Sequence, residues 1–574
     1  MRRSRALVLL AGLLLVVTWP VVPQIGAGIW SDPAGEAAAH LWGHRAALRG
    51  EGPLWVHSQA LGYPAGQGFP LIDPGALPLV ALGWALGGPA VAHNLLALGG
   101  LALAALAGWR WAGRIGAPPL AAAAFAMVSP PLLSASATGM TEHYLVAVCA
   151  LQAELAARAS RQPIGRITVG ATLLLALCPA LGPYNGLWAA LLNLGLLAHR
   201  AAFRGPAGWA PALRLVGINA LGLILALPVV LGALSDRLGM SGGAQQRGLP
   251  PIERLPEAFR GGMQRGADVL DLLLPLPLTG GAAAAPHRAS LGLGVLLLAL
   301  VAAARRPALR GPAVGAAVCV ALSLGAWVQL GGLPVGGPED PLRGPVGLLT
   351  SAWPALGRIS RWGRAAALAA LALAPLAAAG LPRAPRARAL LAAALLVDLV
   401  VLSPVPWPAR LAPLPAVPDA VRAPLPAAQP AVFNWPPSTT GAPPPGRWRD
   451  ETALAQLIHG HPVGGTIMNA PLSPPVERAF ARLQRALPAG ADLRPALRPL
   501  AEAGFGRLWI DLGRVHLPPE SRAALDACLG PPTAEGPEAA VWTIAPRGCR
   551  SPPLPVRKHA KDVNLDPTAP PNGR

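Results

Sequence analysis

The sequence contains few charged residues and almost no lysine. Asp, Glu, Lys and Arg make up 13% of its 574 residues, whereas a soluble globular protein has about 25%. Hydrophobic residues make up 53%, which excludes a disordered chain, because disorder needs low hydrophobicity and high net charge. The only lysines are Lys558 and Lys561, so arginine supplies nearly all of the positive charge. This composition predicts a protein with a large membrane domain.

Several chemical motifs are absent. The five cysteines form no CxxC pair and no Cys/His zinc spacing. There is no P-loop, no GxGxxG after a predicted strand and no HExxH, and nothing resembles a nucleophile elbow. The net charge of +20 would suit nucleic acid, but no block of basic residues interleaved with aromatic ones occurs. We therefore expect no nucleic-acid partner.

Apolar runs supply the predicted membrane spans. The first, residues 6–22, has no clear signal-peptide cleavage site after it, so we expect a retained helix. Several runs are close to the minimum length for a bilayer core of about 30 Å at about 1.5 Å per residue. Together the runs predict about eleven spans. The later runs are residues 90–108, 117–135, 143–157, 164–181, 185–199, 211–234, 289–304, 312–330, 365–381 and 387–403.

Arginine clusters between the runs predict the orientation. They all fall on one side when the spans alternate, and the positive-inside rule assigns that side to the cytoplasm. The N-terminus is then cytoplasmic, and an odd number of spans puts the chain after residue 403 outside. The run 74–87 would break this agreement if it crossed, so we expect an outer re-entrant or interfacial helix there. The clusters are Arg2/Arg3/Arg5, Arg110/Arg114, Arg158/Arg161/Arg166, Arg200/Arg204/Arg214, Arg305/Arg306/Arg310 and Arg383/Arg386/Arg388.

The chain changes composition after the last span. Residues 404–446 are rich in proline and predict a linker with one strand at Ala431–Trp435. Residues 447–549 have the spacing of a small α/β domain, and residues 550–574 predict a disordered tail. The fold class is therefore mainly α, with a polytopic membrane domain at 1–403 and a small extracytoplasmic α/β domain. The elements expected in that domain are helices at 475–487, 497–503 and 519–529 and strands at 507–511 and 540–544.

Two of the cysteines belong to the predicted outer domain. Cys528 ends a predicted helix and Cys549 follows the last predicted strand. Disulfides persist in oxidising compartments, so we expect these two residues to pair. Cys149, Cys178 and Cys319 lie in spans and are expected to act as small apolar side chains.

The first outer loop, residues 24–89, is unusually polar for this chain. Asp32 follows closely on the end of the first span, and helical spacing puts Asp32, Glu36 and His40 on one face. Trp42 suits the membrane interface. These acids either face water on an amphipathic loop helix or take part in catalysis, and the residues alone leave both interpretations open.

Several segments together resemble the GT-C-type membrane glycosyltransferases of bacteria. The likeness covers most of the chain through short motifs, and the last of them matches the C-terminal domain of many bacterial members. The matching segments follow the first span in the order SDP, HLW, GPLWVHSQALGYPAGQ, AHNLLALGGLALAALAGWRWAGR, FAMVSPPLLSASATGMTEHY, ADVLDLLLPLPL, LSLGAWVQLGG, ALGRISRWGR and QLIHGHPVGGTI.

This resemblance implies a function at the outer face of the bacterial inner membrane. Members carry an essential acid just after the first helix, a position that Asp32 holds here. The implied donor is a sugar on a polyprenyl phosphate drawn from the membrane lipids, and the acceptor is a glycan, a lipid or a protein. Asp32 would act as the catalytic carboxylate, because an acceptor hydroxyl needs a base or a metal to activate it.

Three further candidates lie at span or helix ends on the same predicted side. Glu142 and His143 begin the fourth span, where they either form a solvated helix start that favours an acid or join Asp32 in one cavity as catalytic groups. Asp73 precedes the re-entrant helix, and we expect it to cap that helix, with a role in the site as the alternative. His40 is a further candidate for the same site.

An arginine cluster on the outer side runs against the positive-inside rule. Arg358, Arg361 and Arg364 directly precede a span. They either snorkel to the interface or bind the lipid phosphate, which suits the forked guanidinium group. Metal use stays open because the first loop has no Asp-Xaa-Asp, although Asp32 with Glu36 or Glu142 offers oxygen ligands to Mg²⁺ or Mn²⁺.

The alternative class is a non-catalytic membrane protein, either a transporter or an assembly factor for cell-surface polysaccharide. Transporters place ionisable residues near the middle of the membrane. Here the spans hold few charges, and Glu154 and Asp398 lie near span ends. The charge pattern therefore favours an interfacial site over a path through the membrane.

The predicted orientation has a direct test. Reporter fusions after Arg306 and after Trp407 should report opposite compartments, because the predicted spans 312–330, 365–381 and 387–403 separate the two points. The Arg306 fusion should report the cytoplasm. The same compartment for both fusions would break the assignment.

Overall fold

The structure is a computed structural model. It describes residues 3–31, 37–52, 55–71, 73–203, 209–239, 266–273, 290–331, 333–337, 340–352, 362–401, 407–435, 451–466, 472–513 and 515–549.

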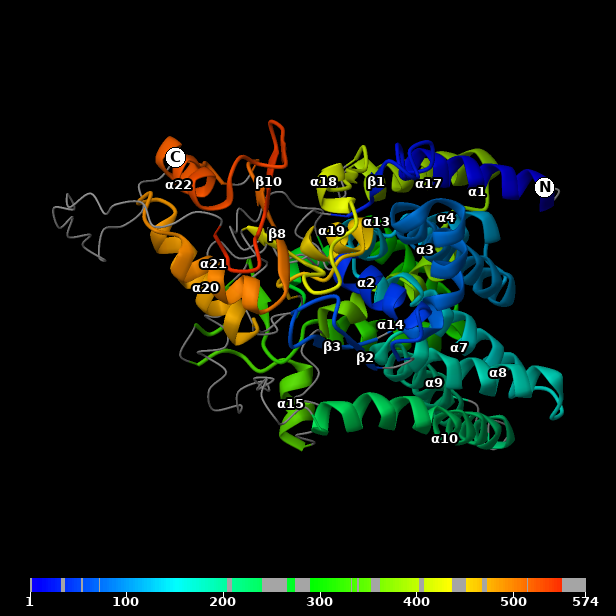
Figure 1. Cartoon of the computed structure of the whole chain (residues 1–574). Coiled ribbons are helices and arrows are strands. Elements are labelled where there is room, and N and C mark those ends of the chain that lie inside the picture. Colours follow the sequence, from blue (N-terminus) through cyan, green and yellow to red (C-terminus); the bar gives the residue numbers. More distant parts are fainter. Residues whose placement is uncertain are drawn as a thin grey trace.

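Helices dominate the chain up to residue 401, which confirms the mainly α fold (Figure 1). Each predicted apolar run contains helix. The principal helices are α1 (Arg3–Val17), α3 (Leu77–Ile115), α4 (Pro119–Met127), α5 (Pro130–Thr138), α6 (Thr141–Tyr144), α7 (Ala147–Ala159), α8 (Arg166–Leu177), α9 (Pro183–Phe203), α10 (Trp209–Gly239), α12 (Val269–Leu273), α13 (Leu293–Arg305), α14 (Arg310–Ser323), α15 (Pro345–Ala352), α16 (Ala365–Gly380) and α17 (Pro385–Val401).

Four helical stretches of the described chain are long and apolar enough to cross a membrane, namely Pro74–Ile115, Pro119–Thr138, Trp209–Val230 and Trp362–Gly380. Shorter apolar helices accompany them, so the count of about eleven spans stays a prediction. In Trp209–Val230 only 22% of the apolar window is buried, against 89% in Trp362–Gly380. The first is therefore peripheral, and its exposed Leu213 and Ile224 suit contact with lipid.

Two predicted spans differ from continuous helices. The run 117–135 breaks at Val128 and Ser129 into α4 and α5, because Pro130 starts a new helix there. The run 143–157 starts as the short α6 and continues as α7 only from Ala147. Glu142 and His143 therefore lie on α6 and not at the start of the long helix.

The run 74–87 folds back on the helix that follows it. The backbone leaves helical angles at Gly87 and Gly88, and Gly88 has φ +81°, a conformation that glycine adopts without strain. Gly83 lies against Ala92, and Leu79 lies near Gly99. α3 is thus a helical hairpin, which is the arrangement that a re-entrant segment requires.

α16 is the central helix of the bundle. It consists almost entirely of alanine and leucine, and it packs on α3, α4, α7, α13 and α14. Small residues let the backbones approach closely, as apolar helices do in membranes. Gly380 meets the backbone of Leu298, and a Cβ on Gly108 would lie 2.5 Å from the Ala122 carbonyl oxygen. The core therefore depends on close backbone contact more than on large side chains.

The first loop is ordered by short elements. Its parts are β1 (Gly28–Ile29), α2 (Ala37–Leu48), the hairpin of β2 (Trp55–Ser58) and β3 (Gln67–Pro70), and the 3₁₀ turn Pro74–Ala76. β1 pairs with β6 (Ala412–Pro413), which ties the start of the loop to the chain that follows α17. The loop thus lies between the helices and the C-terminal part.

The C-terminal part contains a four-stranded sheet of order β7-β8-β10-β9. β7 (Ala431–Trp435) is parallel to β8 (Phe505–Asp511), and β10 (Ala539–Thr543) is antiparallel to both β8 and β9 (Ala534–Glu535). Four helices accompany it, α19 (Glu451–His459), α20 (Pro474–Ala486), α21 (Arg494–Glu502) and α22 (Pro519–Leu529). The predicted helices and strands of 475–544 are confirmed, with boundaries shifted by at most a few residues. β7, from the proline-rich segment, belongs to this sheet.

The two faces of the sheet bury different cores. Phe433, Leu508 and Trp542 pack with α20–α22, whereas the alternating residues Trp509 and Val541 join the core of the first loop and the helix bundle. This alternation follows from the two-residue period of a strand. Figure 1 shows β8 and β10 between α20–α22 on one side and α19 and α2 on the other. The sheet is therefore packed directly against the first loop.

Specific contacts fasten this junction. The Trp42 indole donates to Gln456 Oε1 at 3.0 Å, which joins α2 to α19. Tyr63 packs edge-on against Phe505, with ring centroids 5.5 Å apart. The Tyr63 amide also donates to the Val463 carbonyl. The first loop is consequently held both by α19 and by the sheet of the C-terminal part.

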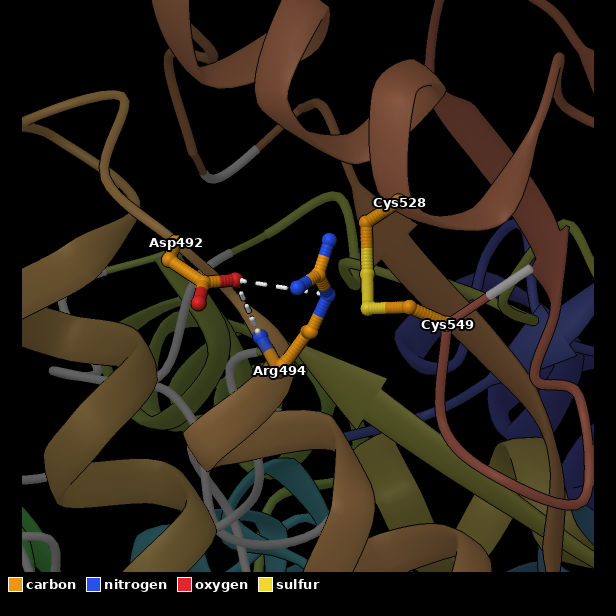
Figure 2. Close-up of a disulfide and its surroundings, with 4 residues drawn as sticks. All are labelled: Asp492, Arg494, Cys528 and Cys549. Carbon is orange, nitrogen blue, oxygen red and sulfur yellow. Dashed lines mark hydrogen bonds and ion pairs between the residues drawn. A yellow bond between two sulfur atoms is a disulfide. The ribbon is translucent and has the colours of Figure 1, made fainter. Parts of the chain in front are cut away.

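A disulfide joins Cys528, near the end of α22, to Cys549 beyond β10 (Figure 2). The two Cα atoms are 4.7 Å apart, within the usual range for disulfides. Beside it Arg494 faces Asp492, whose Oδ1 accepts from the Arg494 amide at 3.1 Å. Cys149, Cys178 and Cys319 are free and buried.

Removing this disulfide should destabilise the protein. The bond closes a loop with a sequence separation of 21 residues, which predicts a loss of about 3 kcal/mol when it is absent. Cys528→Ser with Cys549→Ser should lower the thermal midpoint, and reductant should then have no further effect. Cys319→Ser is the control. Two alkylatable thiols at 528 and 549 in unreduced protein would contradict the pairing.

Candidate functional site

α2 presents two histidines on one face. His40 and His44 are one helical turn apart, and both are fully buried. The alanine-rich sequence of α2 favours a helix, and Trp42 anchors the other side to Gln456. The two imidazoles therefore lie on the same face of α2, and their burial leaves the side chains little conformational freedom.

His44 contacts Asp73, just before the re-entrant helix. His44 Nε2 is 2.9 Å from Asp73 Oδ1, and the Thr141 hydroxyl donates to Asp73 Oδ2 at 2.6 Å. Burial alone would raise the pKa of Asp73, but the charges and hydrogen bonds of His44, His40 and Thr141 outweigh it and hold the pKa at about 2. Asp73 is therefore ionised at neutral pH.

The prediction that Asp73 caps its helix is wrong. Asp73 stands at the cap position, but its side chain makes no capping hydrogen bond. Its carboxylate turns inward instead, because His44 and Thr141 provide partners in a site closed to water. Asp73 thus connects α2 with α6.

Glu142 forms a second buried ion cluster. Its Oε1 is 2.5 Å from Arg364 Nη1, and its Oε2 is 3.4 Å from His40 Nε2. Arg364 also lies over the Tyr184 ring, 5.2 Å from its centroid, and its Nη2 donates to the Met140 sulfur. The Arg364 side chain is 2% exposed, so it does not snorkel to an interface.

Helix starts assemble these groups. Arg364 immediately precedes α16, Thr141 and Glu142 open α6, and Asp73 precedes the hairpin α3. Histidines from α2 close the cluster from the first loop. The polar groups thus collect at one end of the central apolar helices.

Polar contacts fix the chain that leads from α1 to this cluster. The Asn94 carboxamide accepts from the Trp30 amide and donates to Ile25 and Gly28, each at 2.8 Å. His93 Nε2 is 3.2 Å from the Trp30 carbonyl and 3.0 Å from the Tyr144 hydroxyl. Residues 25–30 are therefore held against α3.

The next part of the first loop meets Gly139. A Cβ on Gly139 would lie 2.6 Å from the Ser31 hydroxyl and 2.7 Å from the Ala37 amide nitrogen. Ser31 and Ala37 are the described residues on either side of 32–36. Both thus lie at the turn that precedes Thr141 and Glu142.

The structure brings together four of the residues that the sequence singled out: His40, Asp73, Glu142 and Arg364. His143 is buried on α6 beside them. The remaining candidates, Asp32, Glu36, Arg358 and Arg361, lie outside the described residues.

Sequence reasoning missed three members of the cluster, namely His44, Thr141 and Tyr184. The signal for His44 was available, since it follows His40 by one helical turn in the predicted loop helix. Thr141 and Tyr184 carry no comparable sequence pattern. Their roles depend on contacts between segments far apart in the chain.

The described part of the chain holds no group of three or more His, Cys, Asp or Glu residues placed to bind a metal ion. Each carboxylate of the cluster already faces cationic or donor groups. The expected Mg²⁺ or Mn²⁺ ligands included Asp32 and Glu36, which lie outside this part. The arrangement supports anion binding and proton transfer more directly than cation binding.

No protein-family model matches the chain, and no curated protein matches it. Among solved structures, the chain is similar to arabinofuranosyltransferase AftD from Mycobacteria, with TM-score 0.48, 18% identity and coverage of 95% of this chain. It spans 40% of the AftD chain. It is also similar to apo ArnT from Cupriavidus metallidurans, with TM-score 0.42, 13% identity, and coverage of 96% of this chain and 99% of ArnT. Both TM-scores are below 0.5.

Breaking the Glu142–Arg364 pair should be costly. Glu142→Gln leaves a buried guanidinium without its counter-charge, which typically costs about 3–5 kcal/mol. Combining it with Arg364→Gln should cost less than the sum of the two single changes. The measurement is the thermal midpoint of the purified protein in one detergent.

The exposed pair Arg498–Glu502 supplies the matched control. Its atoms are 2.7 Å apart, but both side chains are more than half exposed. Glu502→Gln should therefore change stability by less than about 1 kcal/mol. Equal shifts of the thermal midpoint in Glu142→Gln and Glu502→Gln would show that the buried pair stabilises the protein no more than the exposed pair does.

Proposed function

We propose that the chain is a membrane glycosyltransferase that transfers a sugar from a polyprenyl-phosphate donor to an acceptor at the outer face of the bacterial inner membrane. In this proposal the N-terminus is cytoplasmic, and residues 447–549 form an extracytoplasmic domain above the site. Asp32 is the catalytic carboxylate. The observation that carries the proposal is the buried cluster of Glu142, Arg364, Asp73 and the α2 histidines.

The position of the cluster supports transfer at an interface. Ionisable groups are expensive inside hydrocarbon, and those that persist usually have a function. These groups gather at one end of α16 and α3, beneath the first loop and the C-terminal sheet. A lipid-borne donor and a water-borne acceptor can meet only at such a boundary.

Arg364 suits the departing phosphate. Two of its nitrogens face Glu142 and Met140, but its Nε is buried without a hydrogen-bond partner among the described residues. A phosphate offers only acceptor oxygens, and guanidinium groups bind it in forked geometry. We include Arg358 and Arg361, which precede Arg364 closely in sequence, in the same anion-binding role.

Asp32 is proposed as the general base. Asp32 directly follows Ser31 in the sequence. Ser31 lies against Gly139, and Gly139 precedes Glu142 by three residues. In the reaction, Asp32 takes the proton from the acceptor hydroxyl as that oxygen bonds to the anomeric carbon. The bond from that carbon to the phosphate oxygen breaks, and the polyprenyl phosphate leaves with its electron pair. Glu36, Glu142, His40 and His143 are the remaining candidates for proton transfer or positioning.

Asp32→Asn tests the proposal because it keeps the size of the side chain and removes its charge. Loss of a general base typically slows a reaction about 10²–10⁴-fold. The assay is transfer of labelled sugar by the purified protein from a panel of synthetic polyprenyl-phosphate hexoses and pentoses. The control is Asp419→Asn, whose side chain is fully exposed.

Two results would count against this assignment. Unimpaired transfer by Asp32→Asn would eliminate Asp32 as the base. Absence of transfer by the wild type from every donor in the panel would favour the non-catalytic alternative, a transporter or an assembly factor for cell-surface polysaccharide.

A further inference from the structure

An apolar cavity lies among α3, α7, α9, α14 and α16. Every described residue that lines it is apolar, and the one indole N–H, of Trp111, is already bonded to the Ala150 carbonyl oxygen at 2.8 Å. A cavity without free polar groups does not hold ordered water but accepts apolar ligands.

This cavity is separate from the charged cluster described above. Its walls include Ile115 at the end of α3 and Gly311 and Pro312 at the start of α14. Neither Glu142 nor Arg364 lines the cavity, although its lining on α16 begins at Leu368, one helical turn after Arg364. On α3 and α14 the cavity therefore reaches the helix ends that carry arginine clusters of the predicted cytoplasmic side.

Charged residues flank the cavity on three of its helices, including α14, where Arg310 precedes Gly311. On α3, Trp111 and Ile115 line it, and Arg110 and Arg114 directly precede them. On α7, Ala153 lines it and Glu154 follows. Arg110 Nε and Nη2 lie 3.0 and 2.9 Å from Glu154 Oε2, and Arg114 Nη1 lies 3.8 Å from Oε1.

Positive charge is in excess at this place. Glu154 is the carboxylate that Arg110 and Arg114 share, and Arg158 and Arg161 lie close enough to Arg114 to repel its charge. The Arg110 side chain is 38% exposed, whereas Glu154 is 7% exposed. A guanidinium group thus faces outward beside an apolar cavity.

We propose that this is a binding site for one anionic phospholipid of the cytoplasmic leaflet. An acyl chain occupies the cavity, and the phosphate binds Arg110 and its neighbours. Basic pockets between membrane helices on the cytoplasmic side recognise anionic head groups in this way, and the apolar cavity gains from burying methylene groups. The combination of a cationic rim and an apolar cavity fits neither a free anion nor a neutral hydrocarbon.

Gly315 provides a sharp test of the cavity. It lines the cavity on α14, and a Cβ added there would meet no atom within 4 Å. Gly315→Phe therefore has room for its Cβ, places an aromatic ring at the cavity wall and should weaken lipid retention about tenfold or more. The matched control is Gly217→Phe on the peripheral α10, where a Cβ also meets open space.

Arg110→Gln tests the head-group contact, since it keeps hydrogen bonding to Glu154 and removes the positive charge. It should lower the preference for anionic over zwitterionic lipid while retention of the zwitterionic lipid stays unchanged. The control is Arg386→Gln at the exposed start of α17. It removes the same charge from another arginine cluster of the predicted cytoplasmic side.

The measurement is native mass spectrometry of delipidated protein offered phosphatidylglycerol, phosphatidylcholine or polyprenyl phosphate at equal concentration. Retention of one phosphatidylglycerol by the wild type and by both controls, and its loss in Gly315→Phe, supports the site. Gly315→Leu replaces Gly315→Phe if that variant does not fold. Equal retention of phosphatidylcholine, preference for polyprenyl phosphate, or undiminished retention by the cavity-filling variant would overturn the proposal.

Discussion

The need to compensate charge inside an apolar bundle governs this structure. Glu142 lies where water does not reach, and an isolated carboxylate there would be far too costly to keep. Arg364 and His40 supply the compensation from segments far apart in the chain. Asp73 is balanced in the same way by His44 and Thr141. Removing any one partner leaves an uncompensated charge in a low-dielectric environment. The four segments that carry these groups, namely α2, the turn before α3, α6 and the start of α16, therefore depend on one another.

The apolar framework solves the opposite problem, which is how to hold helices together when lipid is as apolar as their side chains. Close backbone approach provides the attraction, and small residues permit it. α16 is therefore built from alanine and leucine, and glycine lies at its contact with α13. The closely packed helices of this framework therefore support the polar cluster at one end of the bundle.

Local patterns predicted much of the fold. α22 and β7 have the predicted boundaries because their residues match the helix and strand periods. The break at Val128 and Ser129 was missed because hydropathy continues across it, although Pro130 marks a new helix start. Asp73 was assigned to a cap because it directly precedes the predicted re-entrant helix, whereas its actual partners come from other segments.

The candidate site was predictable as a set of residues but not as a set of pairs. His40 stood out by its helical spacing from the acids of the first loop, Glu142 by its place at the start of a span, and Arg364 because its cluster runs against the positive-inside rule. Nothing local shows that Arg364 reaches Met140, 224 residues earlier, or that Tyr184 lies under its guanidinium group. Such contacts follow from the packing of the bundle, which a single sequence does not specify.

The junction between α2 and α19 also has a consequence for the time course of biosynthesis. Trp42 and Gln456 are separated by 414 residues, and chains are synthesised at about 5–20 residues per second. Synthesis of the chain between Trp42 and Gln456 therefore takes roughly 20–80 s. During that interval α2 has the helix bundle on one side and nothing on the other, so Trp42 and the neighbouring apolar surface are open to mispairing or to a chaperone.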